Sequence, residues 1–263
     1  MSIFEWGDRE DRPYTGDAMN FFVNVAGLFV TIFFTSAFPL SPTEILAAMD
    51  KNRDYGTVSY IGSMEIHIGG EVRTKAMKVL GVGTEKALVE FTNAQDKGTK
   101  YLKINKELWI YFPSEQDVVK ISGHMLKEGM MGSDVSYEDA LEADALKKKY
   151  TATLTGEETF DGHACHILTL AATVKDVPYY KRKMWVDKEL FIQWKEEMFA
   201  KSGTLIKVSH VLDVKKIGIR NFPVKLEMVN MLRKDTKTIF EMSDVAFDVK
   251  VDKTIFSLQN LQR

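Results

Sequence analysis

The stretch TVSYIGSMEIHIGGEVRTKAMKVL, residues 57–80, decides the fold of this chain. Residues 57–68 predict a β-strand, Gly69-Gly70 predicts a tight hairpin turn, and residues 71–80 predict the antiparallel partner strand. Further strands are predicted at residues 84–92, 99–105, 107–112, 149–155, 163–174, 179–187, 190–199, 204–215, 224–233 and 236–248. About ten or eleven consecutive strands with tight turns predict one antiparallel sheet in meander order, and a twisted sheet of that size tends to curl or close.

Alternating side chains give these strands one apolar face and one polar face. Val224, Leu226 and Met228 are predicted to point to one side of their strand, and Lys225 and Glu227 to the other. Because the chain offers few helices to cover it, the apolar face has to wrap around its own side chains, a helix or a ligand.

One helix is predicted just before the first strand. Ser41-Pro42-Thr43-Glu44 combines a capping residue, a proline in the first turn and the glutamate of a capping box. Ile45, Leu46 and Met49 follow at helical spacing. This helix is a natural plug for the curled sheet.

Residues 113–148 interrupt the series of strands. Met125, Leu126, Met130 and Met131 lie there among several glycines, and a short helical run follows Ser136. Two interpretations stay open, because methionine adapts to varied apolar partners but loop apolar residues usually pack. The segment is either a movable cover over the sheet or part of the ordinary core.

Composition excludes several classes of protein. The 263 residues carry a formal net charge of −2, which argues against nucleic-acid binding, and the 45% of hydrophobic residues fit a globular domain. A single cysteine allows neither an internal disulfide nor a four-cysteine zinc site.

The N-terminal part predicts export. No charged residue occurs from Ala18 to Thr43, and the apolar run ends in Thr35-Ser36-Ala37. We therefore expect residues 1–37 to be a signal peptide and residues 38–263 to be the mature domain, with an uncleaved membrane anchor as the alternative. The acidic residues before the run are atypical of a signal peptide.

Candidate chemical motifs are weak. His163, Cys165 and His166 are types of metal ligand, but alternation in a strand places Cys165 and His166 on opposite faces, so we expect a buried structural cysteine. The acidic residues at positions 134, 138, 139, 142 and 144 are expected to form a solvated face rather than a calcium site. The basic runs 147–149 and 181–183 are expected to be solvated on an edge strand, with contact to lipid head groups as the alternative. No catalytic site, cofactor or metal is expected.

Several segments together resemble a known family. Residues 156–168, GEETFDGHACHIL, are similar to the pattern Gly-Glu-Glu-x-x-x-Gly-x-x-Cys-x-x-Leu of bacterial outer-membrane lipoprotein-sorting proteins, which are relatives of LolA. Residues 131–139, 184–189 and 240–245 resemble the same family, in the same order.

The resemblance implies a mainly β (α+β) fold: a single curved antiparallel sheet that forms an incomplete β-barrel with covering helices. It implies a periplasmic protein that carries or binds lipid or lipoprotein acyl chains in an apolar cavity and takes part in lipoprotein or lipid sorting. It also implies a possible RND-type inner-membrane transporter as partner, and a non-enzymatic adaptor docking on such a transporter is the alternative function.

A fourteen-carbon acyl chain gains roughly 11 kcal/mol on leaving water, at ~0.8 kcal/mol per methylene, so a carrier needs an apolar concavity and a cover that competes with the ligand. The residues predicted to line that cavity or its lid come from the plug helix, the strand that leads into residues 113–148, and the methionine-rich segment itself. They are Ile45, Met49, Trp109, Tyr111, Phe112, Met125, Leu126, Met130 and Met131.

Overall fold

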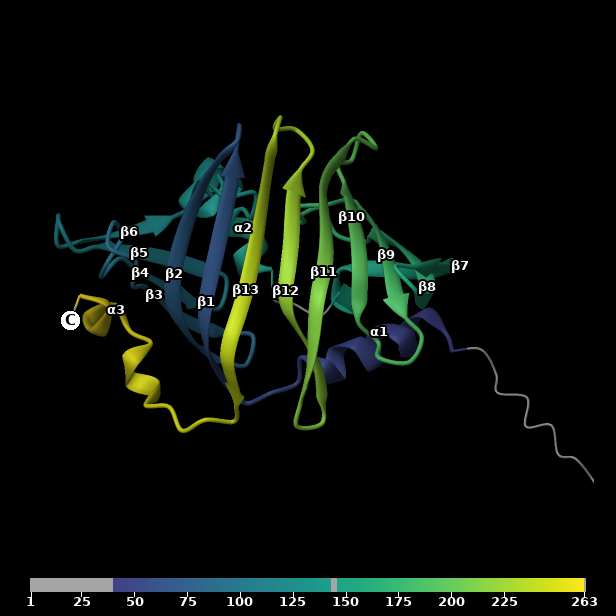
Figure 1. Cartoon of the computed structure of the whole chain (residues 1–263), viewed down its shortest axis with the longest axis horizontal. Helices are drawn as coiled ribbons and strands as arrows, with labels where there is room; N and C mark the ends of the chain where they lie inside the picture. Colours follow the sequence, from purple (N-terminus) through teal and green to yellow (C-terminus); the bar gives the residue numbers. More distant parts are fainter. Residues whose placement is uncertain (1–39, 143–145, 263) are drawn as a thin grey trace, which may run out of the picture. The chain divides into compact units, whose positions relative to one another are not determined.

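The structure, a computed structural model, describes residues 40–142 and 146–262. The predicted signal peptide lies outside these residues. The described chain forms a unit that begins at Leu40 and contains one sheet of thirteen strands with short helices (Figure 1). The strands are β1 Thr57–Ile68, β2 Glu71–Val82, β3 Lys86–Phe91, β4 Lys100–Ile104, β5 Glu107–Phe112, β6 Asp117–Ile121, β7 Tyr150–Phe160, β8 His163–Ala172, β9 Lys181–Asp187, β10 Gln193–Phe199, β11 Leu205–Ile217, β12 Arg220–Asn230 and β13 Thr236–Phe247.

Three α-helices and four 3₁₀ turns occur in the described residues. They are α1 Pro42–Asn52, η1 Gly123–Lys127, η2 Met130–Gly132, α2 Tyr137–Leu141, η3 Leu146–Lys148, η4 Lys253–Ile255 and α3 Leu258–Leu261. The capping box predicted for α1 is confirmed: the Ser41 hydroxyl accepts from the Glu44 amide, and the Glu44 carboxylate accepts from the Ser41 amide.

The strand order differs from a simple meander. It runs β6-β5-β4-β3-β2-β1-β13-β12-β11-β10-β9-β8-β7, so the first and last strands of the chain pair at the centre of the sheet. Val58 lies opposite Phe247, and Ile68 lies opposite Thr236. Two meanders, β1–β6 and β7–β13, are thereby joined along one antiparallel seam. The sequence prediction missed this seam, and it missed β6 inside the predicted interruption.

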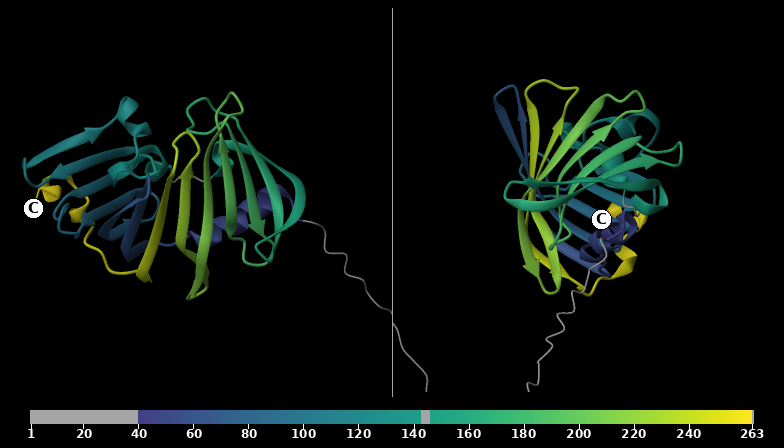
Figure 2. Two further views of the ribbon diagram at one scale, coloured as in Figure 1. Left: turned by 45° about the horizontal axis from the view of Figure 1, so that its top comes forward. Right: turned by 90° about the vertical axis from the view of Figure 1, so that its right-hand side faces the viewer.

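The sheet is curved, and the chain between its two edges crosses the concave face (Figures 1 and 2). This crossover segment, described at residues 122–142 and 146–149, follows edge strand β6 and precedes edge strand β7 at the opposite end of the strand order. α1 lies against the concave side of the second meander (Figure 2). The predicted curved, unclosed antiparallel sheet with covering helices is confirmed.

Candidate functional site

The crossover segment covers the concave face of the first meander. A cluster of buried apolar residues from β1 to β6, including Met64, Met77 and Phe91, lines this face. Leu126, Met130 and Met131 of the crossover segment pack against that cluster, as do Tyr137 and Leu141. These three predicted cover residues therefore contact the same apolar cluster on the concave face of the sheet.

The plug helix α1 covers the second meander. Ile45 and Met49 are buried with Leu168 and Leu170 of β8 and with Met184 of β9. The concave face thus has two apolar regions, each with its own cover. Ile45 and Met49 belong to the region under α1, and Leu126, Met130 and Met131 belong to the region under the crossover segment.

The other four predicted residues do not join either cover. Trp109 and Tyr111 pack with Leu102 and the C-terminal Phe256 in a cluster on the opposite, outer face of the sheet. Alternation explains this, since the neighbours Leu108 and Ile110 occupy the inner face. Phe112 and Met125 are exposed, at the end of β5 and in η1.

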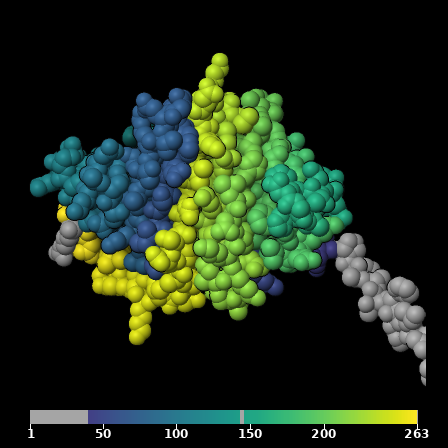
Figure 3. Space-filling model, in the orientation of Figure 1, coloured from purple at the N-terminus to yellow at the C-terminus, as the bar shows by residue number. Residues whose placement is uncertain are grey.

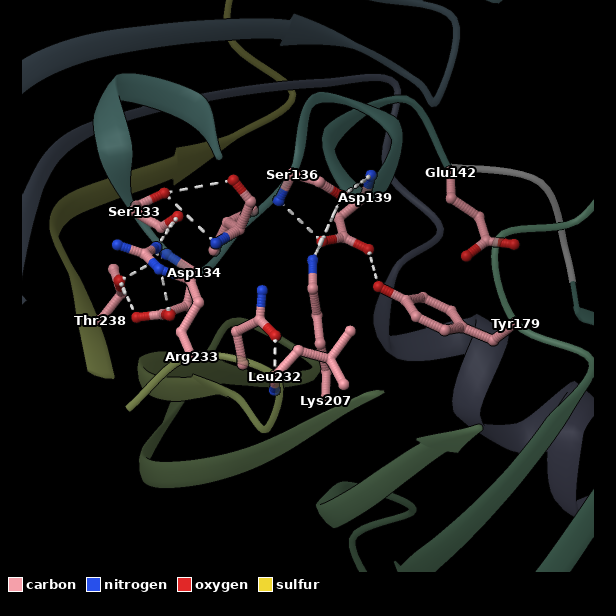
Figure 4. Close-up of polar contacts among 12 residues, drawn as sticks. Ser133, Asp134, Ser136, Asp139, Glu142, Tyr179, Lys207, Leu232, Arg233 and Thr238 are labelled. Atoms are coloured by element: carbon pink, nitrogen blue, oxygen red, sulfur yellow. Dashed lines mark hydrogen bonds and ion pairs between the residues drawn. The ribbon is translucent and has the colours of Figure 1, made fainter. Parts of the chain in front are cut away.

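Three acidic residues of the crossover segment contact polar groups of the sheet or of the chain next to it, and we call these contacts the polar strip (Figure 4). Asp134 is the first of them. Its Oδ1 accepts from Thr236 Oγ1 at 2.7 Å, and its Oδ2 accepts from Thr238 Oγ1 at 3.0 Å. Arg233 Nη1 donates to the Ser133 carbonyl at 3.1 Å and lies 3.5 Å from Asp134 Oδ1.

Asp139 is the second contact. Its carboxylate forms a short ion pair with Lys207 of β11 and accepts a 2.6 Å hydrogen bond from the Tyr179 hydroxyl. Burial acts to raise the pKa of Asp139, but the pairing with Lys207 and the hydrogen bonds from Tyr179 and Ser136 leave that pKa below its ordinary value of 3.8. Burial, reinforced by the charge of Asp139, raises the pKa of Tyr179, which therefore keeps its proton and donates.

Glu142 is the third contact. It pairs with Arg182 of β9, and Arg182 Nη1 also donates to Glu196 of β10 at 2.9 Å. The guanidinium lies 5.3 Å from the ring centroid of Tyr150 and 5.1 Å from that of Tyr179, within the range of cation–π contacts. Burial acts to lower the pKa of Arg182, but Glu196 and Glu142 raise it overall, so Arg182 stays charged.

These contacts correct two sequence expectations. Asp134, Asp139 and Glu142 turn inward instead of forming a solvated face, because each finds a hydrogen-bond donor or a cation on the sheet. Asp144 lies outside the described residues. Arg182 is buried on β9, which lies between β8 and β10 and is no edge strand. The only sequence signal for this strip was the acidic cluster itself.

A cavity of about 320 Å³ lies between the two meanders. Its lining includes Val58, Tyr60 and Val79 from β1 and β2, and Arg182 and Glu196 from β9 and β10. Gly81 and Ala87 also line it, and their small size leaves room. A larger hollow of about 710 Å³ adjoins it at Thr84 and Glu142, which line both spaces.

The His-Ala-Cys-His stretch has other roles in the structure. Cys165 is buried with Ile167 and Trp185 on the outer side of β8. His163 stacks on Trp194 with ring centroids 3.9 Å apart, while His166 lies 3.4 Å from Glu157. His163 and Cys165 thus share the outer-face cluster that contains Trp194, whereas His166 lies beside Glu157. No described helix is both long and apolar enough for a membrane span.

Comparisons with known proteins agree with this fold. A family model described as that of an uncharacterized protein matches residues 83–263, and no curated protein matches the chain. A DUF1329 family protein from Desulfovibrio piger is 25% identical over 84% of this chain and 100% of its own, with a TM-score of 0.78.

Two further solved structures have the same fold at lower identity. A putative outer membrane lipoprotein-sorting protein domain from Vibrio parahaemolyticus is 24% identical, covers 84% of this chain and 97% of its own, and has a TM-score of 0.74. A LolA superfamily protein from Nitrosomonas europaea is 21% identical over 84% of this chain and 99% of its own, with a TM-score of 0.70. The resemblance predicted from sequence is confirmed: the chain belongs to the family whose model matches residues 83–263, and it has the fold of outer-membrane lipoprotein-sorting and LolA superfamily proteins.

Proposed function

We propose that this protein is a periplasmic carrier or binding protein for lipid or lipoprotein acyl chains, which it holds on the concave face of the sheet. The observation that carries the proposal is the apolar concave cluster of β1–β6, covered by Leu126, Met130 and Met131 of a segment that belongs to neither meander. The names of the two lipoprotein-sorting and LolA superfamily structures point in the same direction.

The size of the open space indicates how a ligand enters. The cavity of about 320 Å³ lies at the lower end of the usual range for ligand pockets, and the adjoining hollow of about 710 Å³ is lined mostly by charged residues such as Lys127, Glu138 and Lys148. A long acyl chain therefore gains most of its contacts by replacing Leu126, Met130 and Met131 on the sheet. Ligand and crossover segment compete for the same apolar surface, and Met130 and Met131 adapt readily to either state.

The polar strip sets the strength of that competition. Asp139 with Lys207 and Glu142 with Arg182 hold the crossover segment on the sheet. Because the apparent affinity of a ligand scales with the fraction of protein in the open state, weaker contacts in this strip give tighter acyl binding.

A displacement assay with a fluorescent fatty-acyl probe tests the proposal. Asp139→Asn removes the charge partner of Lys207, and Tyr179→Phe removes one hydrogen bond to Asp139. We expect both variants to bind the probe more tightly than the wild type, Tyr179→Phe by about fivefold, since one hydrogen bond contributes about 1 kcal/mol. Glu71→Gln, which breaks an exposed ion pair with Arg73, is the matched control and leaves the affinity unchanged.

Mass spectrometry of material extracted from the purified chain supplies the second readout. Co-purified lipid or acylated peptide near one-to-one stoichiometry supports the carrier. Protein that is repeatedly empty and does not bind the probe contradicts it and favours the adaptor. Delivery through an RND-type transporter stays a prediction.

A further inference from the structure

Three turns lie side by side at one end of the sheet, the end at which β1, β10 and β12 finish. The amide of Gly69, in the β1–β2 turn, donates to the Asp235 carbonyl at 3.0 Å. The amide of Met231 donates to the Ile206 carbonyl at 2.8 Å, next to the β10–β11 turn. We call residues 69–73, 200–206 and 230–237 the turn end.

The turn end exposes large apolar side chains. Met231 is 49% exposed, Leu232 is 64% exposed, and Val72 of the neighbouring turn is 54% exposed. The β12–β13 connection extends to the upper limit of the molecule as drawn in Figures 1 and 3. About half of the Met231 surface and nearly two thirds of the Leu232 surface therefore stay in water, which is unfavourable for apolar groups.

The same end carries positive charge, although the whole chain has a net charge of −2. Five basic residues stand there against two acidic ones, Glu71 and Asp235; Arg73 pairs with Glu71, and Lys237 pairs with Glu227 outside the turn end. The basic residues are Arg73, Lys201, Arg233, Lys234 and Lys237. Exposed apolar side chains beside lysine and arginine are the combination that binds an anionic lipid surface, since the apolar groups enter the headgroup boundary and the cations stay at the phosphates.

One residue joins this end to the crossover segment. Arg233 follows directly after Leu232, and its Nη1 donates to the Gly132 and Ser133 carbonyls at 3.3 and 3.1 Å. The same Nη1 lies 3.5 Å from the Asp134 carboxylate, so a lipid phosphate competes for this guanidinium with two carbonyls and one longer carboxylate contact. Contact with a membrane at Leu232 therefore acts on the segment that covers the concave face.

We propose that the turn end, led by Met231 and Leu232, is the surface by which this protein docks on an anionic membrane. The inference rests on the proposed carrier function for its purpose, since it names where the carrier meets a lipid surface. Its test uses no acyl ligand, so loss of docking and loss of acyl binding are separate results.

The experiment places an environment-sensitive fluorophore on Leu232→Cys in the full chain. Cys165 is buried, so labelling occurs at the new thiol. The matched control is Ile219→Cys, because Ile219 is 88% exposed in the β11–β12 turn at the opposite end of β11. The signal reports the surroundings of one side chain, so apolar residues elsewhere in the chain do not produce it.

With phosphatidylglycerol vesicles we expect a blue shift and quenching by brominated lipid at position 232, and neither at position 219. Phosphatidylcholine vesicles are expected to give at most a weak response. Lys201→Gln and Lys234→Gln should each weaken docking by about fivefold, because a basic residue near an anionic surface contributes about 1 kcal/mol. Lys216→Gln, next to the control turn, should leave docking unchanged.

Three results overturn the proposal. The label at position 232 stays in water with both kinds of vesicle, which points to a protein partner for this surface. The labels at positions 232 and 219 respond equally. The response to phosphatidylcholine equals that to phosphatidylglycerol, which removes the role of the basic residues.

Discussion

Asp139 shows how single residues hold the crossover segment in place. Its carboxylate is enclosed by Lys207, Tyr179 and Ser136, which belong to three different parts of the chain. A buried ion pair is a weak source of net stability, but removing one partner leaves an uncompensated charge that costs several kcal/mol. The role of Asp139 is therefore positional: it fixes where the crossover segment lies on the sheet.

The lowered pKa of Asp139 predicts a particular pH dependence. A carboxyl whose pKa falls below 3.8 on folding stabilises the folded state above pH 3.8, and this contribution is lost as the pH drops through the folded pKa. At pH 7 we expect Asp139→Asn to lower the free energy of unfolding by about 3 kcal/mol. Urea unfolding of the wild type and of Asp139→Asn at pH 7 and at pH 3 checks this. The difference in unfolding free energy between the two proteins should be smaller at pH 3.

The control for this prediction is Glu71→Gln. The Glu71 and Arg73 side chains are 73% and 62% exposed, and exposed pairs contribute at most about 1 kcal/mol. A difference between wild type and Asp139→Asn that is the same at both pH values would contradict the proposed ionisation.

At the scale of elements, the crossover segment is shaped by a tight loop of its own. The amide of Met130 donates to the Val135 carbonyl at 2.8 Å, and the amide of Tyr137 donates to the Glu128 carbonyl at 3.1 Å. This closure presses the backbone of Gly129 against Ser133, so that a Cβ at position 129 would lie 2.0 Å from the Ser133 oxygen. Met130 and Met131 of this loop pack against the apolar cluster of β1–β6, and Asp134 of the same loop bonds to Thr236 of β13.

Gly129→Ala should therefore break this loop. Because the atom in the way is backbone, we expect a loss of about 3 kcal/mol in unfolding free energy, the upper part of the range for overpacking. Gly132→Ala is the matched control: its φ of +83° is strained for alanine, but no atom lies within 4 Å of the added Cβ, so about 1 kcal/mol is expected. Equal losses in the two variants, measured by urea unfolding, would refute the steric argument.

At the scale of the whole sheet, the pairing of β1 with β13 determines whether the two meanders unfold together. β1 pairs with both β2 and β13 from Val58 to Ile68, and the ladder between the two meanders shifts register once, between Ser59 and Ile61. The crossover segment also links the two meanders, because it contacts β4 through Lys103 and β9 through Arg182. These connections favour a single cooperative unit.

Native-state hydrogen exchange tests this cooperativity. We expect the most protected amides of β4 and of β8, which lie in different meanders, to open with the same free energy. Exchange rates are measured at a series of low denaturant concentrations. We expect the opening free energies of the β4 and β8 amides to converge on the free energy of global unfolding. A lower opening free energy for one meander throughout would show that it unfolds separately.

Local patterns explain which parts of the molecule the sequence predicts. Alternation and turn residues placed twelve of the thirteen strands, and the capping box placed α1, because these signals arise between residues a few positions apart. The resemblance of residues 131–139 and 156–168 gave the fold. The strand β6 was not predicted because it has only five residues and lies between a proline-containing turn and the methionine-rich segment.

By itself, then, the sequence determined twelve of the thirteen strands, the helix α1, the presence of a methionine-rich segment between two series of strands, and the family. Only the tertiary structure decided that β1 pairs with β13 and that Trp109 and Tyr111 face outward. It also decided that three acidic residues turn inward to meet partners on the sheet: Asp134 with Thr238, Asp139 with Lys207, and Glu142 with Arg182. The physical reason is sequence separation. Such contacts join residues tens to nearly two hundred positions apart, and no local pattern of polarity records which cation or hydroxyl a buried carboxylate will meet once the sheet has curved.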